Sequence, residues 1–152
     1  MAALAALFHN KVLIAALAWW AIAQLVKVPI NYAVQRKIDF RLWVSAGGMP
    51  SSHAALVCAL ATAVALQYGL DSGAFAICVA LAMVVMYDAT GVRQAAGRQA
   101  AILNQIIDEL FQGHPISEQR LKELLGHTRI QVIIGALMGI LGTLALWEYW
   151  RF

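Results

Sequence analysis

Two histidines stand where polar segments of the chain meet long apolar ones. His53 follows the turn-forming residues "GGMPSS" and begins a run that stays uncharged up to Leu70. His127 lies in "LLGHTRIQV", just before the apolar run that starts at Ile130. Histidine titrates near neutrality, so one imidazole can attack phosphorus while another protonates the leaving oxygen. The pair therefore indicates nucleophilic and acid–base chemistry at a phosphate group.

An anion site is expected beside His53. Ser51 and Ser52 precede it and offer hydroxyl donors, and the first turn of a helix presents backbone N–H groups at the positive end of the helix dipole. Arginine forks match phosphate oxygens in pairs and neutralise developing charge, so neither a metal ion nor another cofactor is expected. The basic residues that we expect to hold phosphate are Lys27, Arg41, Arg93 and Arg98.

Composition places these residues in a membrane protein. The chain has 152 residues, of which 12% are charged, and a mean hydropathy of +0.71, which is too apolar for a soluble domain of this length. Four runs lack charge, and each approaches the roughly 20 residues that cross a bilayer. They predict an all-α fold, an integral membrane helical bundle with about four transmembrane helices. The expected spans in this single transmembrane domain (1–152) are 12–30, 53–70, 73–90 and 129–148.

The distribution of positive charge predicts the orientation of the bundle. Of the eleven Lys and Arg residues, nine lie in or beside the segments that join the first span to the second and the third to the fourth. Cytoplasmic loops collect positive charge, so both termini are expected outside and the site in the cytoplasm. His53, Asp88 and His127 then converge on one cytoplasmic face. Basic residues that only anchor the chain to anionic headgroups predict the same orientation.

The segment 91–126 is expected to lie at the membrane interface. Apolar residues recur at helical spacing in "GVRQAAGRQAAILNQIIDELF", which predicts an amphipathic interfacial helix on the cytoplasmic side. Ser117 can cap a second, short helix over 118–125. The alternative interpretation is that these helices only connect the spans and pack against the bundle.

Three segments together carry a resemblance to a known superfamily. "PSSH" at Pro50–His53 resembles the Pro-Ser-Gly-His motif of the type 2 phosphatidic acid phosphatase and vanadium haloperoxidase superfamily. "HTRIQVIIG" at His127–Gly135 is similar to the third motif of that superfamily, which has a histidine followed four residues later by an acid. The ordered set "GGMPSSHAA", "YDATGVRQAAG" and "KELLGHT" resembles the divergent, compact membrane branch of the superfamily.

This resemblance implies a helical bundle and metal-independent hydrolysis of a membrane lipid phosphate, as in a phosphatidic acid phosphatase-like phosphoric monoester hydrolase. It implies that His127 is the nucleophile and forms a phosphohistidine, and that His53 is the general acid. Ser51 and Ser52 would hold phosphate oxygens. Gln131 stands where the superfamily has the acid that orients the nucleophile, and Asp88 is the residue that we expect to take over that role.

Two classes of function remain open at this point. The histidine pair favours a lipid-phosphate phosphohydrolase. Gln131 favours a catalytically weak or inactive phosphatase-like scaffold that binds anionic lipid headgroups or serves as an accessory membrane subunit. A third interpretation, in which "DATGVR" is a fragment of an alcohol phosphotransferase motif, is disfavoured because that chemistry needs several aspartates.

The expected partners are membrane lipids, among them a phosphorylated lipid substrate, and no nucleic acid. The sequence does not name the lipid. The spacing of Gly135, Gly139 and Gly142 permits close helix packing, and with it self-association of the chain into a homo-oligomer.

Overall fold

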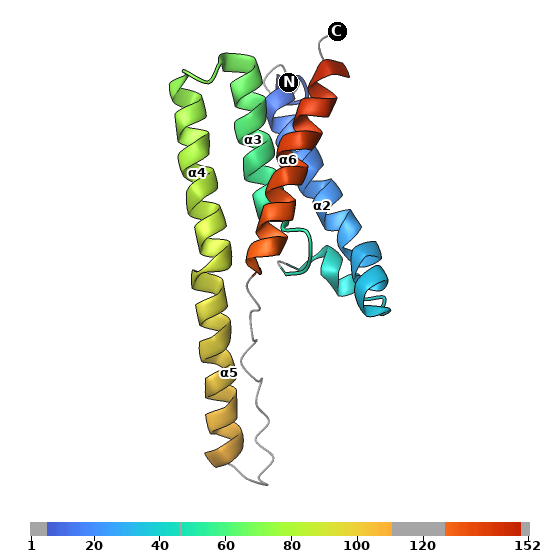
Figure 1. Cartoon of the computed structure of the whole chain (residues 1–152), viewed down its shortest axis with the longest axis vertical. Helices are drawn as coiled ribbons and strands as arrows, with labels where there is room; N and C mark the ends of the chain where they lie inside the picture. The colour runs from blue at the N-terminus through green and yellow to red at the C-terminus, as the bar shows by residue number, and fades with distance from the viewer. Residues whose placement is uncertain (1–5, 46, 111–126, 150–152) are drawn as a thin grey trace.

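The computed structural model describes residues 6–45, 47–110 and 127–149. Its elements are α2 (Lys11–Gln35), the short 3-10 helix η1 (Phe40–Trp43), α3 (Ser52–Tyr68), α4 (Gly73–Thr90), α5 (Val92–Leu110) and α6 (Arg129–Tyr149). Within these residues the secondary structure is helical and contains no strand. The all-α prediction is therefore confirmed (Figure 1).

Three stretches of helix are long and apolar enough to cross a membrane: α2, the stretch Gly73–Ile107 that combines α4 with most of α5, and α6. The fourth expected span, α3, is apolar but has only 17 residues. Each expected span coincides with one helix, which fits an integral membrane bundle. Which end of the bundle faces the cytoplasm stays a prediction.

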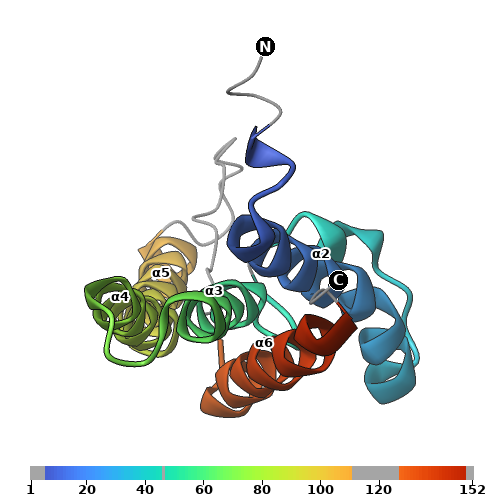
Figure 2. The same ribbon diagram turned by 90° about the horizontal axis from the view of Figure 1, so that it is seen from above.

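The central element is α3. Seen from above, it lies between α4 on one side and α2 and α6 on the other (Figure 2). Its sequence, "SHAALVCALATAVALQY", supplies small side chains on every face, and Ala55, Ala59 and Ala63 have no exposed surface. Small residues let helix backbones approach closely in a membrane, where burial of apolar surface does not drive association.

The closest approach is between α3 and α6. A Cβ atom added to Gly135 would overlap the carbonyl oxygen of Ser51, and one added to Gly139 would overlap that of Ala55. Gly142 faces the indole ring of Trp19 on α2 in the same way. The glycines that were predicted to permit self-association are thus occupied by contacts within the chain, while self-association itself stays an untested prediction.

The direction of the helices brings the polar ends together. α2 begins and α6 ends at one end of the bundle, whereas α3 begins, α4 ends and α6 begins at the other (Figure 1). Two backbone hydrogen bonds tie this second end. The amide of Ser51 donates to the carbonyl of Gln131 (3.0 Å), and the amide of His127 donates to the carbonyl of Ala89 (3.1 Å).

The amphipathic helix expected within 91–126 is present as α5, but it continues the axis of α4 instead of turning away from it (Figure 1). The amide of Gly91 still bonds the carbonyl of Tyr87, and the amide of Ala95 bonds the carbonyl of Gly91, so the helical ladder bridges the junction. The short helix expected over 118–125 lies outside the described residues.

Candidate functional site

His127 lies two residues before α6 begins and is only 2% exposed. Its backbone is fixed by the hydrogen bond to Ala89 at the end of α4. Its ring nitrogen Nδ1 lies 3.2 Å from Oε1 of Gln131, one helical turn further along the chain. Both the position and the rotation of the ring are therefore set by neighbouring groups.

Thr128 and Gln131 form a reciprocal cap at the start of α6. The amide of Gln131 donates to Oγ1 of Thr128 (3.3 Å), and the amide of Thr128 donates to Oε1 of Gln131 (3.1 Å). This is the capping-box arrangement, in which a Thr side chain and a Gln side chain three residues later satisfy two backbone N–H groups at a helix start. Gln131 is thus a structural residue as well as a neighbour of His127.

The cap also fixes the tautomer of His127. A backbone N–H can only donate, so the side-chain atom of Gln131 that faces Thr128 must be the amide oxygen and not the nitrogen. The same oxygen lies beside Nδ1 of His127, and an amide oxygen only accepts. Nδ1 therefore carries the hydrogen, and in the neutral ring the lone pair is on Nε2. Nε2 is the nitrogen that a nucleophilic histidine would use.

His53 faces His127 from the first turn of α3. The centroids of the two imidazole rings are 6.1 Å apart, and their planes make an angle of 64°. His53 is half-buried and borders a cavity of about 260 Å³, which Asp88 at the end of α4 also borders. The structure therefore brings together the two histidines and the aspartate that were expected to converge.

Ser51 and Ser52 are buried, at 0% and 2% exposure. Ser51 is the N-cap of α3, and its hydroxyl oxygen accepts a hydrogen bond from the amide of Ala54 at 3.4 Å. Its backbone amide holds α3 against α6 through the hydrogen bond to Gln131, and its hydroxyl caps α3 itself. A role for either serine in binding phosphate stays a prediction.

Lys27 is buried within α2, with an exposure of 1%. Its ammonium group donates a hydrogen bond of 2.8 Å to the carbonyl of Ser45, and its methylene groups lie against Gly48 in the loop before α3. Lys27 and Gln131 border the same cavity of about 210 Å³. An ionisable residue buried inside a membrane helix usually has a functional role, and the cavity that this one shares with Gln131 places it near the partner of His127.

The three expected arginines lie on η1 and α5, and a role for them in binding phosphate stays a prediction. Arg41 is exposed on η1. Arg93 lies in the first turn of α5, and the backbone of Arg98 is ten residues beyond Asp88, or about 15 Å along a helix axis. Asp39 caps η1 by accepting from the amide of Arg41 (2.9 Å). Within the described residues, the buried cation beside the site is therefore Lys27.

No group of three or more His, Cys, Asp or Glu side chains in the described part of the chain is arranged to hold a metal ion. Thr128 is the residue of the site that sequence reasoning missed. Its signal was present in the sequence, because Thr128 and Gln131 have the Thr-x-x-Gln spacing of a capping box.

The fold and the histidine pair define an integral membrane protein built on a phosphatase-like helical scaffold. The chain belongs to the Divergent PAP2 family, whose profile matches residues 8–142. It is similar to the uncharacterized membrane protein YuiD of Bacillus subtilis (strain 168), with 45% identity over 151 residues that cover 92% of this chain and 96% of the relative. No solved structure matches the chain.

Proposed function

We propose that the protein is a membrane lipid-phosphate phosphohydrolase in which His127 is the nucleophile and His53 the general acid. The observation that carries this proposal is the pair of imidazole rings 6.1 Å apart, one of them held at Nδ1 by an amide oxygen so that the lone pair of the neutral ring is on Nε2. Membership of a phosphatase-like family supports the same chemistry.

In the first step, the Nε2 lone pair of His127 attacks phosphorus. The bond between phosphorus and the alcohol oxygen of the lipid breaks, and that oxygen takes a proton from the protonated ring of His53, so that a neutral lipid alcohol leaves. The positive charge on the phosphorylated ring of His127 is delocalised toward Nδ1, whose hydrogen remains bonded to Oε1 of Gln131. The amide oxygen thus supplies a dipole where other members of the superfamily are expected to have a charge.

In the second step, water attacks phosphorus on the phosphorylated His127. His53, now neutral, accepts a proton from that water. The bond between phosphorus and Nε2 breaks, the electron pair returns to the ring, and inorganic phosphate leaves. Lys27, which borders a cavity together with Gln131, contributes positive charge near the site. Its ammonium group has three donors, of which the Ser45 carbonyl uses one.

A second candidate function is the binding of an anionic headgroup without turnover. The observation that favours it is the double use of Gln131 as a helix cap and as the acceptor from His127, because a neutral amide stabilises a cationic ring less than a carboxylate does. On this proposal the same polar end binds phosphate, and the lipid is released unchanged.

The deciding experiment measures phosphate release from a panel of lipid phosphates by the purified protein, with and without chelator. We expect release from at least one lipid, no turnover and no acid-labile phosphoenzyme from His127→Ala, and a rate from His53→Ala that is lower by about 10²–10⁴-fold, the usual contribution of a general acid. Release that survives His127→Ala contradicts the phosphohistidine mechanism. Binding of inorganic vanadate without release from any lipid supports the scaffold function.

A further inference from the structure

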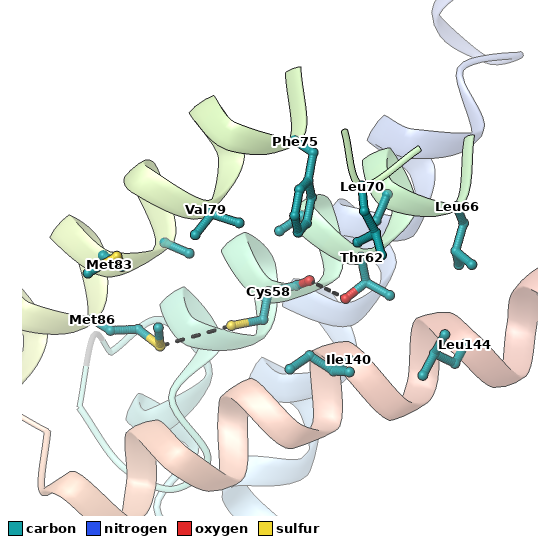
Figure 3. A pocket seen from close by; sticks show the side chains of 13 residues that line it. Cys58, Thr62, Leu66, Leu70, Phe75, Val79, Met83, Met86, Ile140 and Leu144 are labelled. Atoms are coloured by element: carbon teal, nitrogen blue, oxygen red, sulfur yellow. Dashed lines mark hydrogen bonds between the residues drawn. The ribbon is translucent and has the colours of Figure 1, made fainter. Parts of the chain in front are cut away.

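A second feature of the molecule is an apolar groove between α3, α4 and α6, with a volume of about 580 Å³ (Figure 3). Phe75, Val79 and Met83 line it from α4, Cys58 and Thr62 from α3, and Ile140 from α6. The groove exists because α4 packs along α3 but scarcely contacts α6. A space between the two outer helices is left with α3 as its floor.

The chemistry of the groove wall selects an apolar occupant. The hydroxyl group of Thr62 already donates to the carbonyl of Cys58 at 2.8 Å, and the side chains around it are hydrocarbon or sulfur-containing. Met83 and Leu70 are 66% and 73% exposed at the rim, on segments that are apolar enough to cross a membrane or adjoin one. The rim is thus open to the acyl region of a bilayer, where hydrocarbon chains are the surrounding material.

One end of the groove lies close to the histidine end of the bundle. Met86 lines the groove and lies three residues, about 4.5 Å of rise, before Ala89, the residue whose carbonyl binds the amide of His127. A cluster of small side chains, in which Ala54, Ala89 and Val132 are buried, lies between the two regions. Met86 packs against this cluster as well. The groove therefore ends beside the packed side chains that border the site.

The length and size of the groove suit a single hydrocarbon chain. Along α3 the wall runs from Cys58 to Leu66, which is about 12 Å of helix. A narrow, extended chain can lie along this wall within the volume of about 580 Å³. A helix of a second copy is the competing occupant, and the test below separates the two.

We propose that this groove binds one hydrocarbon chain of the phosphate-bearing lipid, whose phosphate lies at His53 and His127. The inference rests on the proposed function for the position of the headgroup, but the groove itself does not depend on turnover. It assigns the substrate to lipids with at least one long, flexible chain that can lie along α3, and it places the end of that chain near Leu66 and Leu144.

The test uses a photoreactive ligand that cannot be hydrolysed, hexadecylphosphonate with a diazirine on its terminal carbon, and the full-length protein in lipid nanodiscs. We expect labelling to be concentrated at the far end of the groove, on Leu66, Leu70 or Leu144. Labelling that is spread equally over Ile77, which is 71% exposed on α4 and lies outside the groove, overturns the proposal.

A matched pair of variants sharpens the result. Ala65→Phe places a ring inside the groove, and Ala76→Phe places the same ring on an exposed part of α4 outside it. We expect Ala65→Phe to lower groove labelling about tenfold, because it displaces at least two methylene groups, and Ala76→Phe to leave it unchanged. Leu144→Trp blocks the exposed rim and serves the same purpose if Ala65→Phe does not fold.

The outcomes separate this inference from the proposed function. Groove labelling that Ala65→Phe abolishes, together with no phosphate release from any lipid, supports the groove and contradicts hydrolysis. Phosphate release without groove labelling supports hydrolysis and contradicts the groove. A Leu66→Cys variant tests for a second copy in the groove. If the fraction of chains cross-linked in pairs through this cysteine equals the fraction that is not labelled, a second copy is the occupant and the proposal is overturned.

Discussion

α3 is packed in different ways against α6 and α4. Toward α6, Gly135 and Gly139 bring the two backbones into contact, and a hydrogen bond joins Ser51 to Gln131. Toward α4, longer side chains such as Phe75 and Met86 make the contact, and the apolar groove is open beside them because α4 scarcely contacts α6. We call the contact of α3 with Gly135 and Gly139 of α6 the seam, and it is rigid because backbones touch there. On the α4 side, the groove is a space that an occupant can fill.

This difference teaches how a short membrane chain can position two side chains without a large core. Backbone contact leaves little freedom of rotation or sliding, so the seam fixes the distance between His53 on α3 and His127 beside α6. Side-chain contact is more adaptable, because rotamers can change while the backbone stays in place. The seam therefore suits the reacting groups, and the groove suits a flexible chain.

The largest effect is expected from breaking the seam with Gly139→Leu. The new side chain would overlap the Ala55 carbonyl and must force α6 away from α3, so we expect a loss of about 3 kcal/mol or more in the free energy of unfolding. Gly73→Leu is the matched control, because nothing lies within 4 Å of a Cβ atom at Gly73. Thermal unfolding in detergent compares them. Equal unfolding temperatures would show that the seam does not determine stability.

A second effect is expected from removing the charge of Lys27, which is buried on α2. Lys27→Met keeps the shape of the side chain and removes its charge, and we expect it to weaken vanadate binding by about 10–100-fold, the value of a charge-assisted hydrogen bond. Lys37→Met, at an exposed position, should leave binding unchanged. If Lys27→Met lowers the unfolding temperature but not the affinity for vanadate, Lys27 only anchors the loop at Ser45.

Much of this architecture could be predicted from the sequence. Uncharged runs locate the three helical stretches that are long and apolar enough to cross a membrane and the shorter apolar helix α3, because the bilayer demands about 20 apolar residues whatever the helices pack against. The meeting of His53, Asp88 and His127 follows from the alternating direction of successive spans. The straight continuation of α4 into α5 was not predicted, since the amphipathic segment was expected to lie at the membrane interface, yet the amide of Gly91 stays within the helical ladder.

The parts that were missed depend on contacts between helices. Gln131 was interpreted as a lost acid, and its role as a cap becomes visible only when its oxygen is seen beside both Thr128 and His127. The spacing of the glycines predicted close helix packing, but it does not name the helices that pack, and α6 makes these contacts with α3 and α2. The groove has no sequence signal, because it results from the separation of α4 and α6.

A smaller effect is expected from placing an acid at position 131, where the superfamily is expected to have one. Gln131→Glu keeps the oxygen that caps Thr128 and adds a negative charge beside Nδ1 of His127, which stabilises the cationic ring formed during attack. We expect hydrolysis to accelerate by about tenfold, since a hydrogen bond to a charged acceptor exceeds a neutral one by about 1 kcal/mol or slightly more. Gln131→Leu removes cap and acceptor together and should slow the reaction. A rate that Gln131→Glu leaves unchanged would contradict a cationic intermediate at His127.

The smallest effect is expected from Thr128, and it separates the capping of α6 from the chemistry of His127. Thr128→Val keeps the shape of the side chain but removes the hydroxyl oxygen that accepts from the amide of Gln131, and the loss of an N-cap costs about 1 kcal/mol in the free energy of unfolding. Thr128→Ser retains that oxygen and should behave as the parent protein. Because the cap also holds Oε1 of Gln131 beside Nδ1, we expect ¹⁵N NMR of labelled histidine to show the Nδ1–H tautomer of His127 in the parent and Thr128→Ser proteins and a mixture of tautomers in Thr128→Val. A mixture already present in the parent protein would mean that the rigid seam positions the backbone of His127 but not its proton.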